Sequence, residues 1–414
     1  MLYKRAIEEL LKNELLNTHP SIMLVGPRSI GKTTALTQLA KSTLDLSIPS
    51  IKEAVEADPD LILSRTEKPV LVDEWQELPE ILWAIKRAID TDSQNKPGQY
   101  LIAGSAEANI NTASYPLSGR TIRKNLYGLT QAELEGNPTH NIIDELFSDL
   151  TTSRFPSHKG GKQDLIKRIA RGRFPNLVGL KPKTRNQRLN AYIDHTIQRD
   201  AALLADKRPR PELFKSFLKV VASFTGEQPT KKMLADRTNI SIPTADTYLD
   251  TMHKLCLIAT LPGWKSNLTK RELDNKKIHL IDTSLACNLT NLSEESLITN
   301  DRLGHLTETF VVSEFLTHLQ TSQTQAQLFH FRTKDQTEVD LVAETNEGQI
   351  AAIEIKAGKS VTDQDAKGIR HLKTRLKNRF HCGIIVSTIE YPRQVEDRIW
   401  AVPLSYLWQT APQT

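Results

Sequence analysis

The sequence predicts an α/β protein in which two α/β regions flank a helical middle. Short apolar segments at residues 21–25, 70–72 and 100–103 alternate with helical patterns, which is typical of a parallel sheet. Beyond about residue 135 the hydrophobic spacing becomes helical. From about residue 305 strand and helix patterns alternate again, which indicates a second, separate α/β domain.

The length and composition indicate a soluble protein of several domains. A chain of 414 residues exceeds one compact core. We expect a nucleotide-binding core at 1–135, a helical basic segment at 136–205, a winged-helix-like module at 206–290 and an α/β domain at 300–414. No apolar run approaches the roughly 18 residues of a membrane span, and the N-terminus lacks a signal-peptide pattern. Three widely spaced cysteines predict reduced thiols, and a cytoplasmic location is expected.

A phosphate-binding motif lies at residues 26–33, which fit G-x-x-x-x-G-K-[ST] at every fixed position. A strand is predicted before the motif and a helix over about 32–41 after it. Glycines let the loop approach phosphates closely, and the helix N-terminus adds positive potential. We therefore expect ATP and Mg²⁺, with Lys32 on the β- and γ-phosphates and Thr33 on the metal. The predicted loop is Gly26, Pro27, Arg28, Ser29, Ile30, Gly31, Lys32, Thr33 and Thr34.

Acidic and polar residues follow the next two predicted strands. Asp73 and Glu74 end the strand that lies 40 residues beyond Thr33. This position is the carboxyl edge of the sheet, where open α/β sheets bind ligands. Asp73 is expected to hold the Mg²⁺ shell and Glu74 to polarise the attacking water. Ser105, after the third strand, is expected to contact the γ-phosphate or the water, with a helix cap as the alternative.

Two arginines are candidates for an arginine finger. Arg120 is the first candidate, supplied either in cis or by a neighbouring subunit, and a structural ion pair is the alternative. Arg199 is a weaker candidate for the same role. A finger supplied by a neighbour would require a homo-oligomer.

Positive charge is concentrated in residues 154–200, which carry twelve Lys and Arg against three Asp and Glu. The resulting +9 exceeds the +5 of the whole chain. Such a segment can contact DNA phosphates, sense a phosphate or form a solvated helical face. The charge alone does not distinguish these roles; in the leading hypothesis, DNA is a partner of this segment and of the C-terminal domain.

Residues 229–255 have the pattern of a helix–turn–helix, with a turn at 239–241, as in winged-helix modules. The face of its second helix that would read DNA carries Asp246 and Asp250. Two acids do not suit a phosphate backbone. The sequence therefore favours a protein contact or a spacer role over DNA readout.

Carboxylates and a lysine recur in the C-terminal domain on successive predicted elements. Glu308 lies on a helix, Asp340 on a strand, and Glu354-x-Lys356 on the strand that follows in a hairpin. Two acids can hold Mg²⁺ while a lysine orients water near a phosphodiester, and Glu308 can add a ligand. Glu338 or Gln327 is expected nearby. The alternative is a salt-bridged hairpin on a fold that has lost its activity.

Taken together, these motifs resemble those of prokaryotic predicted AAA-type ATPases fused to a C-terminal domain of unknown function with a restriction-endonuclease-like fold. The matching stretches cover nearly the whole chain: GPRSIGKTT at 26–34, VDEWQ at 72–76, AGS at 103–105, GR at 119–120, GRFP at 172–175, RD at 199–200, the winged-helix stretch, EVD at 338–340 and EIK at 354–356. The resemblance implies ATP binding and hydrolysis. It also implies a PD-(D/E)xK-like domain with Asp340, Glu354 and Lys356 at the catalytic positions. Trp75 stands where this family usually has Ile, and Arg173 where it usually has Gly.

Two functions from different classes follow. The first is an ATPase whose hydrolysis drives or gates a DNA-directed, nuclease-like domain. The second is an ATP-switched regulatory scaffold in which the nuclease-like domain is an inactive protein-binding module.

Overall fold

The computed structural model of the chain describes residues 3–94, 96–104, 116–201, 210–265 and 276–409. Ser105 lies outside these residues. The chain divides into two compact units. The first unit comprises Met1–Tyr127, Asp194–Pro209 and Leu249–Leu257, and the second comprises Gly128–Ile193, Arg210–Tyr248 and Ile258–Thr414. The finer division into four domains stays a prediction.

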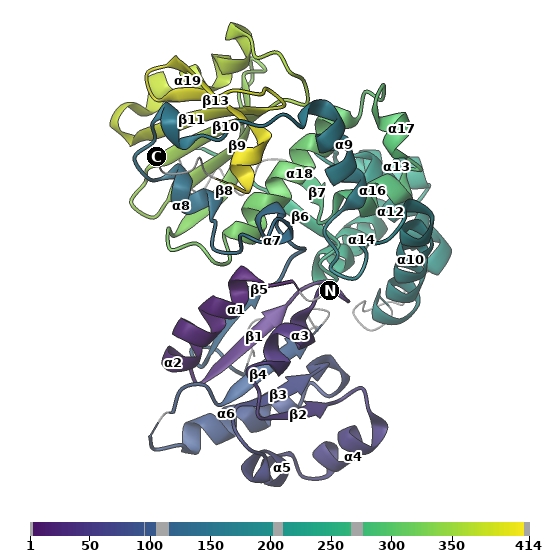
Figure 1. Cartoon of the computed structure of the whole chain (residues 1–414). Coiled ribbons are helices and arrows are strands. Elements are labelled where there is room, and N and C mark those ends of the chain that lie inside the picture. The colour runs from purple at the N-terminus through teal and green to yellow at the C-terminus, as the bar shows by residue number, and fades with distance from the viewer. Residues whose placement is uncertain (1–2, 95, 105–115, 202–209, 266–275, 410–414) are drawn as a thin grey trace. The chain divides into compact units, whose positions relative to one another are not determined.

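The first unit is built on a parallel five-stranded sheet in the order β2-β3-β4-β1-β5 (Figure 1). Its strands are β1 (Ser21–Val25), β2 (Ser42–Asp45), β3 (Val70–Asp73), β4 (Tyr100–Gly104) and β5 (Thr121–Asn125). The three strands predicted from the sequence, β1, β3 and β4, are confirmed and are buried throughout. The partly exposed edge strands β2 and β5 have no apolar run, and the sequence pattern missed them.

Helices and their apolar faces complete the core of the first unit. These helices are α1 (Ala6–Leu10) with its π-helical continuation Leu11–Leu15, α2 (Leu16–Thr18), α3 (Lys32–Thr37), α4 (Pro49–Ala57), α5 (Pro59–Arg65) and α6 (Ile81–Thr91). Prolines open α4 and α5 at positions where no backbone N–H is required. Helix α6 buries Ile81, Leu82 and Ile85 against the strands. Helix α3 ends four residues before the predicted end at residue 41.

The second unit begins with helices, as the sequence predicts. They are α7 (Gln131–Leu134), α8 (Ile142–Leu146), α9 (Gly161–Arg171), α10 (Pro182–His195), α12 (Pro211–Ser223), α13 (Lys231–Thr238), α14 (Ile242–Lys254), α16 (Thr283–Leu289) and α17 (Glu294–Leu297). The last residues of α10 and α14 fall in the first unit. The predicted turn between α13 and α14 is present, with Asn239 in a left-handed conformation at φ 52°. Strands β6 (Ile258–Leu261) and β7 (Lys277–Leu280) pair as an antiparallel ribbon. The winged-helix class of this region stays a prediction.

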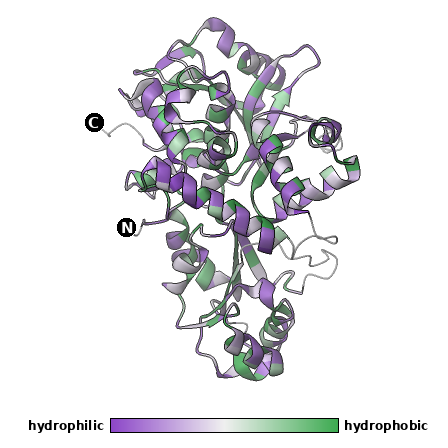
Figure 2. Ribbon diagram, turned by 90° about the vertical axis from the view of Figure 1, so that its right-hand side faces the viewer, coloured by the Kyte–Doolittle hydropathy of each residue, from purple (hydrophilic) through white to green (hydrophobic). Residues whose placement is uncertain are grey.

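The C-terminal part of the second unit contains a six-stranded mixed sheet in the order β12-β13-β11-β10-β9-β8. The chain runs through α18 (Leu303–His318), β8 (Ala326–Arg332), β9 (Glu338–Thr345), β10 (Ile350–Ile355), α19 (Lys367–Leu376), β11 (Phe380–Ser387), β12 (Arg393–Glu396) and β13 (Ile399–Pro403). This order of helix, three strands, helix and strand confirms the predicted elements. Figure 2 shows hydrophobic and hydrophilic residues alternating along many helices, which is typical of a helix with one apolar face. On α19 that face is formed by Ile369, Leu372 and Leu376, which pack on the sheet.

Two further predictions concern the whole described chain. Cys256, Cys287 and Cys382 are all free thiols, as expected from their spacing. In the part of the chain that the structure describes, none of the helices has the length and apolar character needed to cross a membrane.

Candidate nucleotide site and carboxylate cluster

The phosphate-binding loop connects the end of β1 to the start of α3, as the motif predicts. Gly31 precedes the helix with φ 101°, a conformation that favours glycine. At Gly26 a Cβ would overlap the carbonyl oxygen of Leu126, so the backbones approach too closely for any side chain. Both fixed glycines of the motif are therefore required by the local geometry.

Lys32 lies folded under this loop. Its Nζ donates to the carbonyl oxygens of Gly26 and Pro27, each at 2.8 Å, and the residue is only 7% exposed. Burial lowers the pKa of Lys32 to about 8, although the charge of Glu74 partly opposes this shift. The ammonium group is thus held against the backbone of the loop that the motif predicts to bind phosphate.

The second half of the site meets the loop at the carboxyl edge of the sheet. Strand β4 lies between β1 and β3, and Asp73 pairs in register with Ala103. The Thr33 hydroxyl donates to Asp73 Oδ2 at 2.8 Å, and Asp73 Oδ1 accepts from the backbone N–H of Glu74 at 3.0 Å. Burial raises the pKa of Asp73. A hydroxyl and a carboxylate side by side form the oxygen donor set that Mg²⁺ prefers, so these residues fit that ion.

Glu74 is positioned by neighbours from the loop and from the turn that follows β3. It has a left-handed backbone conformation at φ 51° and accepts a hydrogen bond from Gln76 Nε2. Arg28 Nη2 lies 3.8 Å from Glu74 Oε1, and Arg28 Nη1 lies 3.2 Å from His195 Nδ1. Arg28 therefore links the phosphate-binding loop to Glu74 and to the end of α10.

Arg5 supports the loop and was not identified from the sequence. Its guanidinium donates to the carbonyl oxygen of Ile30 at 3.2 Å and to that of Tyr127 at 2.9 Å, and the side chain is buried. Arg5 precedes α1 in a stretch with no motif. No local pattern connects it with a loop 25 residues away.

The two arginine candidates have different surroundings. Arg120 pairs with Asp90 through two hydrogen bonds and precedes β5, whose first residue Thr121 is in register with Ser21. It thus lies at the amino edge of the sheet, opposite the loop, and the expectation of a finger in cis is wrong. Arg199 Nη2 lies 2.5 Å from Glu77 Oε1, just beyond the Asp73–Glu74 turn. A role in trans for either residue stays a prediction.

Many charges of the basic segment have partners within the protein. At least five of its twelve cations form ion pairs: Arg154 with Glu145, Arg168 with Asp164 and Glu135, Arg173 with Glu314, Arg185 with Glu294, and Arg199 with Glu77. Five others are exposed: Lys159, Lys167, Lys181, Lys183 and Arg188. The positive surface is therefore smaller than the sequence count suggests.

The unusual Arg173 has a structural explanation in the second unit. Its Nη1 lies 2.8 Å from Glu314 Oε1, and the two side chains are 1% and 0% exposed. Glu314 Oε2 also accepts from the backbone N–H of Gln131 at 2.8 Å. Burial raises the pKa of Glu314, while the charge of Arg173 opposes the shift. This pair connects the segment after α9 with the middle of α18.

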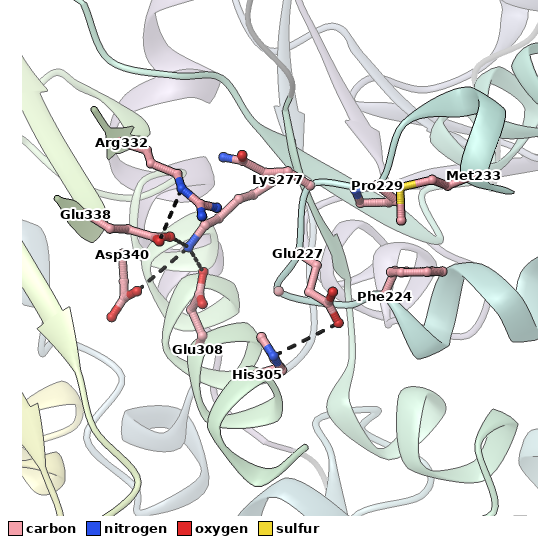
Figure 3. A pocket seen from close by; sticks show the side chains of 12 residues that line it. Phe224, Glu227, Pro229, Met233, Lys277, His305, Glu308, Arg332, Glu338 and Asp340 are labelled. Atoms are coloured by element: carbon pink, nitrogen blue, oxygen red, sulfur yellow. Dashed lines mark hydrogen bonds and ion pairs between the residues drawn. The ribbon is translucent and has the colours of Figure 1, made fainter. Parts of the chain in front are cut away.

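A carboxylate cluster forms in the second unit around a lysine that the sequence analysis did not single out (Figure 3). Lys277 Nζ, from the start of β7, lies 2.8 Å from Glu308 Oε1, 2.7 Å from Glu338 Oε1 and 3.7 Å from Asp340 Oδ1. Burial raises the pKa of Glu308 to about 8, and Asp340 adds to the shift while Lys277 opposes it. Glu308, Glu338 and Asp340 are therefore brought together as expected, but around an ammonium group.

Glu354 and Lys356 extend this cluster at the end of the β9–β10 pair. Lys356 Nζ lies 2.9 Å from Glu354 Oε1 and 3.5 Å from Asp365 Oδ1, while Asp340 Oδ2 accepts from the N–H of Ile355 at 2.8 Å. Burial, with the charge of Asp340, raises the pKa of Glu354. Among the described residues, no group of three His, Cys, Asp or Glu side chains is arranged to hold a metal. The expected metal set Glu308, Asp340 and Glu354 is thus not formed here.

An open cavity of about 400 Å³ adjoins the cluster. Its polar wall comes from Glu227, Glu308, Glu338 and Asp340 with Lys277 and Arg332. His305 and apolar residues such as Phe224 and Met233 line the rest. Gln327 pairs in register with Glu344, near the far end of β9 from Asp340, so its expected place in the cluster is wrong.

Comparison with known families divides the chain into three stretches. Residues 18–135 match the family described as "AAA domain". Residues 162–296 and 303–407 match two families described as domains of unknown function, DUF8612 and DUF4143 respectively. The AAA match contains the loop, Asp73 and Glu74.

Similar proteins are known from bacteria. "Uncharacterized protein Rv2008c" of Mycobacterium tuberculosis and "Uncharacterized protein Mb2031c" of Mycobacterium bovis are each 26% identical over 362 residues, covering 86% of this chain and 74% of theirs. Among solved structures, the Walker-type ATPase PABY2304 of Pyrococcus abyssi is 14% identical with a TM-score of 0.42, over 70% of this chain and 96% of that one. A RuvB variant of Thermotoga maritima is 18% identical with a TM-score of 0.26, over 62% and 86%.

The family match and the loop geometry agree on the N-terminal part of the chain. Thr33 donates to Asp73, and Lys32 donates to loop carbonyl oxygens, as expected around a phosphate-binding loop. Residues 18–135 are therefore similar to AAA domains and carry the phosphate-binding loop, and most of the remainder matches families without an assigned function.

Proposed function

We propose that this protein binds ATP with Mg²⁺ at the loop Gly26–Thr34 and hydrolyses it to ADP and phosphate. The observation that carries this proposal is the hydrogen bond of 2.8 Å between Thr33 and Asp73. It joins the two halves of a phosphate-binding site, a loop hydroxyl and a strand-end carboxylate, at one sheet edge. The AAA family match over residues 18–135 supports it.

The residues of the site have separate tasks in this mechanism. Thr33 and Asp73 would hold Mg²⁺, which neutralises phosphate charge when bound. Lys32 exchanges its two loop carbonyls for phosphate oxygens, and the loop N–H groups bind the remaining ones. After the Glu74 carboxylate separates from Gln76 and Arg28, it accepts a hydrogen bond from the attacking water. In this mechanism the release of Glu74 from Gln76 and Arg28 accompanies nucleotide binding.

Replacing Glu74 with glutamine is expected to lower the hydrolysis rate by about 10²–10⁴-fold while ATP still binds, because only the base is lost. Phosphate release and binding of a fluorescent ATP analogue measure the two effects separately. Glu77→Gln is the matched control, because Glu77 is a nearby carboxylate that pairs with Arg199. Loss of nucleotide binding in Glu74→Gln, or equal rates in both variants, would contradict the assignment.

For the second unit we propose a nuclease-like fold that is directed to DNA and driven or gated by the ATPase. The order α18, β8, β9, β10, α19, β11, with Asp340, Glu354 and Lys356 on adjacent strand ends, supports this fold. The exposed cations Lys159, Lys167, Lys181, Lys183 and Arg188 are the proposed DNA contacts. An arginine finger in trans, from Arg199 or Arg120, would add a homo-oligomer.

A specific observation favours the second candidate, an ATP-switched scaffold with an inactive nuclease-like module. The cavity beside Asp340 is lined by four acids against two basic side chains and one histidine. Such a wall repels the phosphates of DNA unless metal ions compensate for it. Lys277 already occupies the centre of the acid cluster.

One experiment separates the two candidates. Wild type and Asp340→Ala are incubated with plasmid and single-stranded DNA and Mg²⁺, with and without ATP, and binding is measured at two salt concentrations. The DNA-directed candidate predicts affinity that falls steeply with salt, and cleavage that only the wild type shows. DNA affinity that does not change with salt, together with no cleavage by either protein, would contradict the DNA-directed candidate and favour the scaffold.

A further inference from the structure

The carboxylate cluster of the second unit contains its own cation. Lys277 Nζ lies within ion-pair distance of three carboxylates on two elements, α18 and β9, and the nearest oxygens, of Glu338 and Glu308, are 2.7 and 2.8 Å away (Figure 3). Ammonium groups have three donors, and here Glu308, Glu338 and Asp340 surround them. The cation is therefore coordinated on several sides at once, as a metal ion at the same point would be.

Because Lys277 and its acidic partners are buried, the loss of either charge would cost free energy of folding. Lys277 is 3% exposed and Glu308 is 7% exposed. Burial alone lowers the pKa of Lys277, but the charges of Glu308 and Asp340 outweigh it and raise the pKa. Lys277 therefore stays charged throughout the physiological range. Removing it would leave buried carboxylates without a counter-charge, which is strongly unfavourable.

A divalent ion would need the space that the Lys277 ammonium fills. Mg²⁺ binds carboxylate oxygens at about 2.0–2.1 Å and demands near-ideal octahedral geometry. The oxygens of Glu308 and Glu338 already point at Nζ from 2.8 and 2.7 Å. An added ion within ligand distance of both would lie against the ammonium and be repelled by it. The space between Glu308 and Glu338, as folded, therefore does not fit a divalent ion.

We infer that Lys277 is the built-in counter-ion of this cluster, filling the metal position, and that removing its charge converts the cluster into a divalent-cation site. This inference is independent of ATP hydrolysis. According to this inference, the charge of one lysine of β7 determines whether a metal binds among Glu308, Glu338 and Asp340. Lys356 is not equivalent, because it pairs with Glu354 and Asp365 at the neighbouring strand end.

The test measures Mn²⁺ binding to the nucleotide-free, full-length protein by electron paramagnetic resonance. Lys277→Met keeps the length of the side chain and removes its charge, and we expect it to bind Mn²⁺ at least tenfold more tightly than wild type. Mn²⁺ should also raise the melting temperature of Lys277→Met more than that of wild type, because the ion replaces the lost counter-charge.

Three controls make the result specific. Lys276→Met removes the charge of the adjacent, exposed lysine and should bind Mn²⁺ like wild type. Lys277→Arg keeps a cation in place and should show no increase in Mn²⁺ affinity over wild type. Adding Asp340→Asn to Lys277→Met should abolish the gained site. The unchanged nucleotide site in every variant provides a common background.

Two results would overturn the inference. One is a folded Lys277→Met, or Lys277→Gln if the first does not fold, that gains no Mn²⁺ binding over Lys276→Met. The other needs no variant of Lys277: saturable Mn²⁺ binding to wild type that Asp340→Asn removes would show that the metal position is open despite the lysine.

Discussion

Replacing Lys32 with alanine is expected to lower the rate of ATP hydrolysis by about 10²–10³-fold, the usual effect of losing one oriented donor to the transferred phosphate. The expectation rests on the position of Nζ, which the loop carbonyls of Gly26 and Pro27 hold at 2.8 Å. No other lysine of the loop can replace it, since Lys32 is the only lysine between residues 26 and 34. Phosphate release under saturating ATP measures the effect, and nucleotide affinity should fall as well.

Lys41→Ala provides the matched control for this measurement. Lys41 follows α3 on the surface, with its side chain 60% exposed and its Nζ 3.3 Å from Glu67. Exposed pairs of this kind contribute about 0–1 kcal/mol, so the variant should hydrolyse ATP like wild type. Comparable rates of ATP hydrolysis in Lys32→Ala and Lys41→Ala would contradict the assignment of the nucleotide site.

Replacing Arg173 with methionine is expected to lower the free energy of unfolding by about 3–5 kcal/mol. The variant leaves the carboxylate of Glu314, which is 0% exposed, without its partner at 2.8 Å. The double variant Arg173→Met/Glu314→Gln should recover part of the loss. The amide oxygen of glutamine carries no charge and can still accept from the N–H of Gln131.

Urea unfolding followed by circular dichroism measures these changes through the midpoint of the transition. Arg188→Met is the control, because Arg188 is exposed on α10 and its loss should change stability by no more than about 0.5 kcal/mol. If Arg173→Met unfolds at the same urea concentration as Arg188→Met, the buried pair does not stabilise the second unit as proposed.

The nucleotide site was largely predictable because its determinants are local. Glycines, lysine and threonine within eight residues fix the loop, and a strand ending in Asp73 shows where the carboxylate lies. The geometry around Arg5 and Arg28 depends on residues distant in the chain, so no pattern indicated it. Edge strands β2 and β5 were missed because one-sided burial leaves them polar.

The carboxylate cluster, in contrast, could be predicted only in part from the sequence. The order of Glu308, Asp340, Glu354 and Lys356 predicted which acids converge, and Glu338 was expected beside them. Lys277 comes from a different element, 31 residues before Glu308, and follows another lysine in an ordinary polar stretch. Only the folded chain shows which of the two adjacent lysines is buried. Chemistry that depends on one such contact cannot be predicted from the order of motifs.

The division of the chain also matters for dissecting the protein genetically. The first unit is assembled from three separate stretches, since Asp194–Pro209 and Leu249–Leu257 belong to it together with Met1–Tyr127. A gene fragment that stops at residue 135 would therefore lack His195, which contacts Arg28, and Arg199, which contacts Glu77. Exchanging this fragment between relatives at that single junction would separate residues that contact each other within the first unit. Viable chimaeras should instead exchange all three stretches at once.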